Sequence, residues 1–232
     1  MPEKKKRTAP LIAAHDVLVG YGSTTESAVC PPISVTVRER RSLAIVGANG
    51  TGKSTFLRAL AGQLAVLAGR IEVFDRAIDE RSAEFRRDVA IVLDDDSYLP
   101  ALTVREHLLL TARGHGVESA SALVTELLED FGLTPRQHAL PTALSSGQRR
   151  RLLLAAGFVR PRHLLVLDEP EQRLDAGMRD RLTERLAGET AVFATHDPVL
   201  VRGAASAALI LAEDEVRVVD PETGAAAIEE LR

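Results

Sequence analysis

The sequence predicts a layered α/β fold with a mixed sheet at its core. Short runs of aliphatic and β-branched residues recur along the chain, among them "SLAIVG" (42–47), "VAIVL" (89–93) and "HLLVLDE" (163–169). Several of these runs are apolar on both faces, as parallel strands in the middle of a sheet are. Helical patterns fill many of the gaps between them, and strands that alternate with helices are typical of layered α/β proteins.

The composition fits one soluble domain. At 232 residues the chain is long enough for a large domain with a buried core. Apolar residues make up 45% and aromatic residues only 3%, so we expect a core of Leu, Val, Ala and Ile. The net charge of -4 gives no overall attraction to nucleic acid, which is not an expected partner. The single cysteine, Cys30, cannot form an intrachain disulfide, and a reducing cytoplasmic setting is expected.

The expected elements alternate along the chain. Residues 1–10 are basic and are expected to form a flexible tail, because His15 and Asp16 interrupt the apolar stretch that a signal peptide would need. Apolar runs then predict strands at 34–37, 42–47, 70–74, 89–93, 163–169, 190–197, 207–214 and 215–219. Helices are predicted after Gly52 and at 103–113, 120–131, 146–159 and 175–186. The longest apolar run, "GAASAALILA", is about half of the roughly 20 residues that cross a bilayer, so no membrane span is expected.

Residues 97–144 carry helical signals and no convincing strand. Thr103 and Glu106 form the pattern T-x-x-E, which predicts a capping box at the start of the helix 103–113. We therefore expect residues 97–144 to form a helical lobe, inserted into a core made of residues 11–96 and 145–232.

The stretch "VGANGTGKST", residues 46–55, follows a predicted strand and opens a predicted helix. It contains the phosphate-loop pattern G-x-x-x-x-G-K-S, in which glycines let the backbone aim its N–H groups inward at a helix N-terminus. Lys53 would contact the β- and γ-phosphates, and the Ser54 hydroxyl would ligate Mg²⁺. A nucleotide is therefore the expected ligand. The loop residues expected to contact it are Gly47, Asn49, Gly50, Gly52, Lys53, Ser54 and Thr55.

Two acidic residues and a histidine follow apolar strands. Asp168 and Glu169 lie at the strand end where open α/β sheets bind their ligands. Asp168 is a candidate Mg²⁺ ligand and Glu169 a candidate general base for an attacking water, although an acidic helix cap is the alternative. His196 could hydrogen-bond a γ-phosphate or that water, or be merely structural. Tyr21, in a turn before the phosphate loop, could stack on a nucleobase.

The stretch "LSSGQRRRL", residues 144–152, resembles the LSGGQ signature of ATP-binding-cassette (ABC) ATPases. The chain carries in order Tyr21, the phosphate loop, this signature, "VLDE" ending at Glu169, "LD" ending at Asp175 and "TH" ending at His196. The order and spacing resemble an ABC nucleotide-binding domain across nearly the whole chain. Ser146 departs from the usual glycine of the signature but is also small.

The resemblance implies one ABC ATPase domain over residues 1–232. Its fold would be a P-loop NTPase of the ABC type, with a mixed-sheet core, an N-terminal antiparallel β subdomain and the inserted helical lobe. Lys53, Glu169 and His196 would take part in ATP hydrolysis, and Tyr21 would stack on adenine. A head-to-tail homodimer or heterodimer would hold two ATP molecules between its subunits. The residues implied to contact nucleotide from the signature side are Ser145, Gly147, Gln148 and Asp175.

Three aspartates, Asp94, Asp95 and Asp96, follow the predicted strand 89–93. In the ABC family this place usually begins with the glutamine of the Q-loop, which joins the nucleotide site to the helical lobe. Asp94 resembles a replacement of that glutamine. Its carboxylate is a good Mg²⁺ ligand, but it adds a charge and lacks the amide donor. Asp94 is thus a candidate Mg²⁺ ligand with altered coupling or a bystander, and its two neighbours are expected to be solvated.

The resemblance implies the ATP-hydrolysing subunit of an ABC transporter, with ATP and Mg²⁺ bound and a separate transmembrane permease as its partner. Such a subunit would be cytoplasmic and would bind the inner face of the membrane through that partner. The alternatives are a soluble ABC ATPase in translation or DNA maintenance, and a low-turnover nucleotide-binding regulator. A GTPase is disfavoured, because the N-K-x-D motif for guanine recognition is absent. Such a cassette does not encode the transported substrate or the direction of transport.

Overall fold

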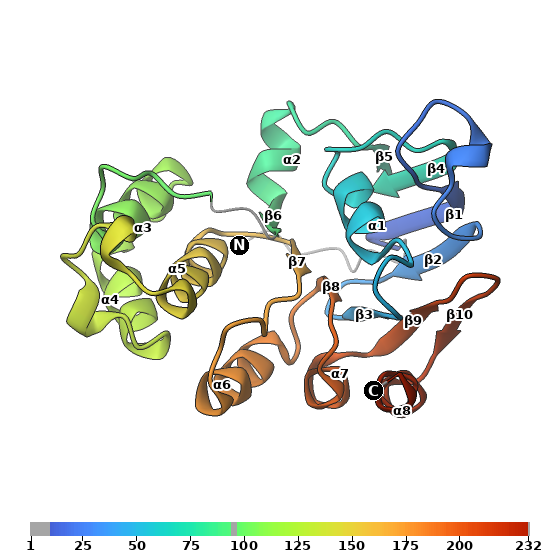
Figure 1. Ribbon diagram of the computed structural model, residues 1–232. Helices are drawn as coiled ribbons and strands as arrows, with labels where there is room; N and C mark the ends of the chain where they lie inside the picture. Colours follow the sequence, from blue (N-terminus) through green and yellow to red (C-terminus); the bar gives the residue numbers. More distant parts are fainter. Residues whose placement is uncertain (1–9, 94–96, 232) are drawn as a thin grey trace.

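The computed structural model describes residues 10–93 and 97–231, which form two sheets and the helices around them (Figure 1). The larger sheet has six strands in the order β10-β9-β3-β8-β7-β6. Its strands are β3 (Leu43–Val46), β6 (Val89–Val92), β7 (Leu164–Asp168), β8 (Ala191–Ala194), β9 (Ala207–Leu211) and β10 (Val216–Val219). All neighbours are parallel except β9 and β10, which are antiparallel. The expected mixed sheet is therefore confirmed.

The smaller sheet has four antiparallel strands in the order β2-β1-β4-β5. They are β1 (Ile12–Leu18), β2 (Ile33–Val37), β4 (Ala68–Val73) and β5 (Arg76–Ala77). β1 lies between β2 and β4, so both of its edges are hydrogen-bonded. The expected N-terminal antiparallel sheet is thus present.

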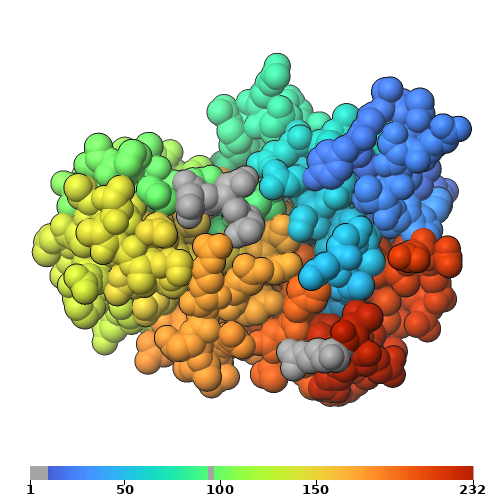
Figure 2. Space-filling model, in the orientation of Figure 1, coloured from blue at the N-terminus to red at the C-terminus, as the bar shows by residue number. Residues whose placement is uncertain are grey.

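The helices divide between the two sides of the larger sheet and one end of the molecule. Helices α3, α4 and α5 pack against one another, whereas α1 packs on β7 and β8, and α7 and α8 pair beside β9. Figure 2 shows the segment from α3 to the start of α5 (green to yellow) at one side, the segment that contains β1 and β2 (blue) at the other, and the segment from β7 to α6 (orange) between them. The bounds are α1 (Lys53–Leu60), α2 (Ala83–Asp88), α3 (Val104–Gly114), α4 (Ala120–Asp130), α5 (Ser146–Val159), α6 (Ala176–Leu186), α7 (Pro198–Ala204) and α8 (Pro221–Glu230). None of these helices is long and apolar enough to cross a bilayer.

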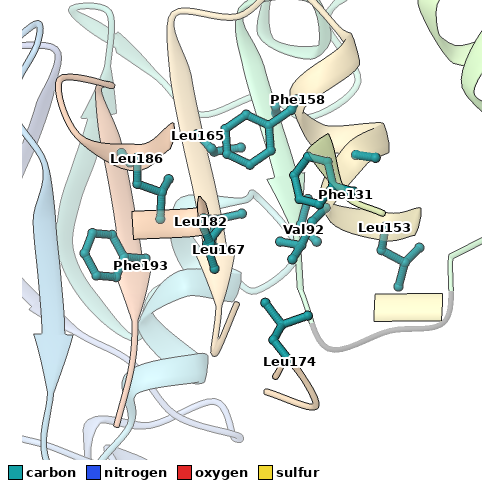
Figure 3. Close-up of a cluster of buried hydrophobic side chains, with 14 of the residues drawn as sticks. Val92, Phe131, Leu153, Phe158, Leu165, Leu167, Leu174, Leu182, Leu186 and Phe193 are labelled. Carbon is teal, nitrogen blue, oxygen red and sulfur yellow. The ribbon is translucent and has the colours of Figure 1, made fainter. Parts of the chain in front are cut away.

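Both faces of the larger sheet are buried, because alternate residues of its strands enter two separate apolar clusters. In β7, Leu165 and Leu167 join one cluster while Leu164 and Val166 join the other. The first cluster includes Phe131, Phe158 and residues of α5 and α6, as Figure 3 shows. The second places α1 between the two sheets. This double burial explains why the strands read as continuous apolar runs.

The sequence located most of these elements but missed five. The capping box predicted for α3 is confirmed, since Thr103 Oγ1 accepts from the Glu106 amide and the Thr103 amide donates to the Glu106 carboxylate. β1 was not predicted because the polar residues His15 and Asp16 interrupt its apolar pattern. The pairing register of the strand also shifts after His15. Helices α7 and α8 each begin with an aspartate cap followed by proline, which is a readable start signal. The other missed elements, β5 and α2, are short.

Candidate functional site

The candidate site lies along one edge of the larger sheet, because β3, β8 and β7 are parallel neighbours whose carboxyl ends meet there. β3 leads into the loop that begins at Gly47 and ends at α1. β7 ends at Asp168, and β8 leads into Thr195 and His196. Segments far apart in the sequence are therefore brought together by strand order.

The loop between β3 and α1 needs glycine at two places. Gly47 has φ +151, and a Cβ there would lie 2.2 Å from the Leu211 carbonyl oxygen. Gly52 has a left-handed backbone with φ +93 and caps α1, and a Cβ there would meet Val29 at 2.9 Å. Any larger residue would be strained at either position. The backbone can therefore turn tightly into the N-terminus of α1.

Lys53, the first residue of α1, is buried at the base of this loop. Its Nζ donates to the Gly47 carbonyl at 2.9 Å and the Ala48 carbonyl at 2.8 Å. Burial lowers the pKa of this ammonium, whereas the negative charges of Glu169 and Asp168 act to raise it. The lysine is thus near both carboxylates that the sequence singled out.

The other predicted loop residues differ in exposure. Asn49 and Gly50 are exposed at the tip of the loop, Ser54 is half-buried and Thr55 is buried in the first turn of α1. Backbone N–H groups at such a helix start favour an anion. The loop therefore offers both an exposed tip and a positive base to a phosphate.

Asp168 and Glu169 lie at the end of β7 with different surroundings. Asp168 is 4% exposed, and Glu169 follows it with a left-handed backbone at φ 44. A non-glycine residue in this region is held by its surroundings. Here the Glu169 amide donates to the Ala194 carbonyl of β8 at 2.9 Å, and the side chain accepts a hydrogen bond from Gln172. The Glu169 carboxylate is therefore fixed to the neighbouring strand and its own loop.

His196 faces Glu169 across the sheet edge, with 3.6 Å between His196 Nε2 and Glu169 Oε1. Its backbone lies just after β8, whose neighbours are β3 and β7. The structure thus brings together four of the predicted residues, Lys53, Asp168, Glu169 and His196.

Tyr21 is 66% exposed in the loop between β1 and β2. The same loop carries Val29 and Cys30, which are the side chains nearest to Gly52. The loop that bears Tyr21 therefore contacts the phosphate loop, while the aromatic ring remains accessible.

The signature residues form a second cluster at the start of α5. Ser145 Oγ accepts from the Gln148 amide at 3.2 Å, and Gln148 Oε1 accepts from the Ser145 amide at 3.0 Å, which makes a capping box. A Cβ on Gly147 would lie 2.6 Å from the Arg173 carbonyl oxygen. Asp175 caps α6 by accepting from the Met178 amide at 2.9 Å. In the single chain these side chains are therefore used as helix caps and close contacts.

Two residues that the sequence did not single out support the site. Arg150, buried in α5, donates to the backbone carbonyls of Asp168 and Glu169, the latter at 2.8 Å. Gln172 holds the Glu169 carboxylate. Arg150 is the middle one of three consecutive arginines, so nothing local distinguished it from Arg149 and Arg151, and nothing local marked Gln172.

Magnesium would need oxygen ligands, and the chain supplies them at this edge. Ser54 and Asp168 are a hydroxyl and a carboxylate, and Mg²⁺ is commonly held by one or two such groups together with substrate phosphates. The described residues contain no cluster of three or more His, Cys, Asp or Glu, as a cage built from protein side chains alone would require. The donor set therefore fits a metal that arrives with a phosphate. The third candidate ligand, Asp94, lies outside the described residues, as do Asp95 and Asp96.

Comparisons with known proteins agree on one family. A family model described as "ABC transporter" matches residues 30–172. The Nod factor export ATP-binding protein I of Bradyrhizobium diazoefficiens is 34% identical over 190 residues, which cover 79% of this chain and 62% of that protein. The sulfoquinovosyl glycerol transport ATP-binding protein SmoE of Agrobacterium fabrum is 31% identical over 196 residues, covering 81% and 54%. The chain thus spans between half and two thirds of the length of these relatives.

The fold also has a solved counterpart. The structure of an ATP-binding subunit of an ABC transporter superposes with a TM-score of 0.81 and covers 90% of both chains, at 24% sequence identity. At this identity the match concerns the fold alone.

Proposed function

This chain belongs to the ABC transporter family, and we propose that it hydrolyses ATP to drive a transporter whose membrane-spanning part is a separate polypeptide. The curated relatives are described as ATP-binding proteins for Nod factor export and sulfoquinovosyl glycerol transport. The transported substrate and the direction of transport of this chain are left open by the proposal.

One observation carries the proposal: a phosphate loop, two carboxylates and a histidine meet at a single sheet edge. The ammonium of Lys53 lies close enough to Asp168 and Glu169 for both charges to affect its pKa, and Glu169 faces His196 at 3.6 Å. A triphosphate held by the loop would present its terminal phosphate to these groups. This arrangement is suited to phosphoryl transfer to water.

The side chains have distinct roles in the proposed reaction. Lys53 binds the β- and γ-phosphates and offsets their charge. Glu169 accepts a proton from the attacking water, while the hydrogen bond from Gln172 keeps the carboxylate oriented. His196 hydrogen-bonds the γ-phosphate or that water. Ser54 and Asp168 would hold Mg²⁺, which when bound neutralises charge on the β- and γ-phosphate oxygens.

Nucleotide binding from the signature side would require a second cassette. Gly147 and Gln148 open α5, whose N-terminal N–H groups favour a phosphate, and Ser145 caps it. We propose that this helix start, together with Asp175 at the start of α6, covers the ATP bound by Lys53 of a partner cassette in a homodimer or heterodimer. The exposed Tyr21 would stack on the adenine.

The proposal places the chain at the cytoplasmic face of a membrane, where it would bind a permease subunit. ATP would close the cassette dimer and hydrolysis would reopen it, which moves helices α3, α4 and α5 with respect to the partner. Co-purification of a membrane-embedded polypeptide with this chain is the expected result. Its recovery only with ribosomes or DNA would favour the soluble alternatives.

The decisive experiment is the Glu169→Gln variant. Gln has nearly the same shape but cannot accept a proton, so we expect at least a roughly 100-fold loss of phosphate release. Binding of Mg-ATP should remain within about threefold of the parent, because the phosphate loop is unchanged. Hydrolysis at the parental rate would show that Glu169 is not the base, and absence of turnover in the parent would remove the proposed activity.

The role of Asp94 is tested separately. Asp94→Gln restores the residue usual in the family, and Asp94→Asn removes only the charge. A change in the Mg²⁺ dependence of the ATPase rate would support Asp94 as a metal ligand. Identical rates and Mg²⁺ dependence in both variants would make it a bystander.

A further inference from the structure

Glu171 is a buried carboxylate that the proposed reaction does not use. It lies in the loop between β7 and α6, two residues after Glu169, and is 7% exposed. Its Oε2 is buried and has no hydrogen-bond partner within residues 10–93 and 97–231. Burying a carboxylate with an unpaired oxygen costs free energy of folding, so a glutamate at this buried position calls for a physical reason.

The other oxygen of Glu171 joins two loops. Glu171 Oε1 accepts from the Thr195 hydroxyl at 2.6 Å and from the His196 amide at 3.0 Å. Thr195 Oγ1 in turn accepts from the Asp197 amide at 3.0 Å. The loop after β7 is therefore clamped to three consecutive residues after β8.

This clamp acts on both partners of the hydrolytic pair. Glu169 is on the same short loop as Glu171, separated from it by Pro170, whose ring fixes one backbone angle. His196 is held through its own amide. The clamp therefore restrains the two loops that set the 3.6 Å distance between His196 Nε2 and Glu169 Oε1.

We propose that Glu171 is a positioning residue for ATP hydrolysis, whose buried carboxylate fixes the His196 backbone and thereby holds the imidazole against the Glu169 carboxylate. The proposal rests on the proposed ATPase function. It assigns to Glu171 no contact with the reacting atoms.

Three variants separate positioning from general stability. Glu171→Leu removes both acceptor oxygens at similar volume, whereas Glu171→Gln keeps an acceptor for the Thr195 hydroxyl and the His196 amide. The matched control is Glu189→Leu. It removes a carboxylate bound to Arg162 at 2.5 Å, just before the start of β8 and so at the opposite end of that strand.

Steady-state ATPase kinetics provide the first measurement. We expect Glu171→Leu to lower kcat by roughly 10- to 100-fold with KM for ATP within about threefold of the parent, because misplacing a catalytic group slows chemistry without weakening binding. Glu171→Gln and Glu189→Leu should keep kcat within about threefold. A kcat for Glu171→Leu within threefold of the parent would overturn the proposal, as would an equal loss in Glu171→Gln.

A measurement independent of activity follows the His196 imidazole by ¹H–¹³C NMR, with the signal assigned by its loss in His196→Gln. The signal should move in Glu171→Leu and stay in place in Glu189→Leu. An unmoved signal would contradict the positioning role, whether or not the parent hydrolyses ATP. A signal that moves in Glu171→Leu, combined with no turnover in the parent, would overturn only the proposed ATPase function. If Glu171→Leu does not fold, Thr195→Val must reproduce the lower kcat at unchanged KM, since it removes one donor to the clamp.

Discussion

At the residue scale, Lys53 shows how burial and nearby charge oppose each other at the site. Burial disfavours its ammonium form, while Glu169 and Asp168 stabilise it. The two carbonyl oxygens it contacts belong to Gly47 and Ala48 of the phosphate loop. The ammonium is thus held at the base of the loop by the same backbone that is proposed to surround the phosphates.

Lys53→Met removes the charge but keeps a long apolar side chain in the same place. We expect the affinity for Mg-ATP to fall roughly 10- to 100-fold, because a charge-assisted hydrogen bond contributes about 1.5 to 3 kcal/mol. Titration with a fluorescent ATP analogue measures the change. An affinity within twofold of the parent would exclude Lys53 from phosphate binding.

The pKa of Glu171 gives a pH-dependent prediction. Burial raises this pKa above its ordinary value of 4.5, and the charge of Glu169 acts in the same direction, against the hydrogen bonds from Thr195 and His196. The folded state therefore binds the proton more tightly than the unfolded state. The free energy of unfolding that Glu171 contributes must then fall as the pH rises from about 4.5 through the raised pKa, and return on acidification.

Glu171→Gln has no proton to lose, so its stability relative to the parent should increase across that interval. The expected gain is roughly 1.4 kcal/mol for each unit by which the pKa is raised. Urea unfolding of both proteins between about pH 5 and 8 measures the difference. A difference that is constant over this range would show that Glu171 does not titrate abnormally.

At the element scale, α3 and α5 begin with the same chemistry but differ in their proposed use. Both carry a capping box, made by Thr103 and Glu106 in α3 and by Ser145 and Gln148 in α5. The cap of α3 has no proposed contact with nucleotide. That of α5 is proposed to face the ATP of a second cassette.

Thr103→Ala and Ser145→Ala should each lower the free energy of unfolding by about 0.5 to 2 kcal/mol, since each removes a cap. Only Ser145→Ala should also reduce the ATPase rate. Urea unfolding and phosphate release measured on the same preparations test this pair. Equal losses of ATPase rate in the two variants would show that Ser145 acts only as a structural cap.

The contact between α5 and the loop after β7 makes a second prediction for this element. A Cβ at Gly147 would lie 2.6 Å from the Arg173 carbonyl oxygen, and backbone cannot move aside as a flexible side chain can. Gly147→Ala should therefore destabilise the protein by about 1 to 3 kcal/mol. The neighbouring Ser146 is exposed, so Ser146→Ala should change the free energy of unfolding by less than about 0.5 kcal/mol. Thermal unfolding compares them, and equal midpoints would contradict the close packing.

At the scale of the whole molecule, one chain holds the two halves of the proposed ATP site in separate clusters. Lys53, Asp168, Glu169 and His196 meet at the edge of the larger sheet, whereas Ser145 and Gln148 bond to each other at the start of α5. The two clusters are linked by Arg150, which reaches from α5 to the backbone of Asp168 and Glu169. The two clusters are therefore in contact through this buried side chain.

Glu169→Gln should dimerise when Mg-ATP is present, because bound ATP is no longer consumed and continues to bridge two chains. Size-exclusion chromatography with light scattering should give twice the monomer mass with Mg-ATP and the monomer mass without it. The double variant Lys53→Met/Glu169→Gln is the control and should remain monomeric. A Glu169→Gln protein that is monomeric at saturating Mg-ATP would argue against two identical cassettes and leave a paralogous partner as the one to test.

The sequence by itself determined the α/β class, the parallel strands and the phosphate loop, because each depends on local chemistry. Apolar runs read directly as doubly buried strands, and Thr103 with Glu106 marks a helix start within four residues. The glycines, Lys53 and Ser54 lie within the single short stretch 47–54, so their pattern is visible without a fold. Asp168, Glu169 and His196 could be nominated in the same way, as polar residues that end apolar strands.

Only the tertiary structure decided which of these residues meet and what holds them. The order of β3, β8 and β7 in the sheet places His196 against Glu169. Strand order depends on contacts between distant segments, so no single stretch of sequence predicts it. β1 exists as a strand because β2 and β4 pair with both of its edges. The contacts of Arg150 and Glu171 join segments that only folding brings together, since hydrogen bonds between loops depend on distances in space rather than on spacing along the chain.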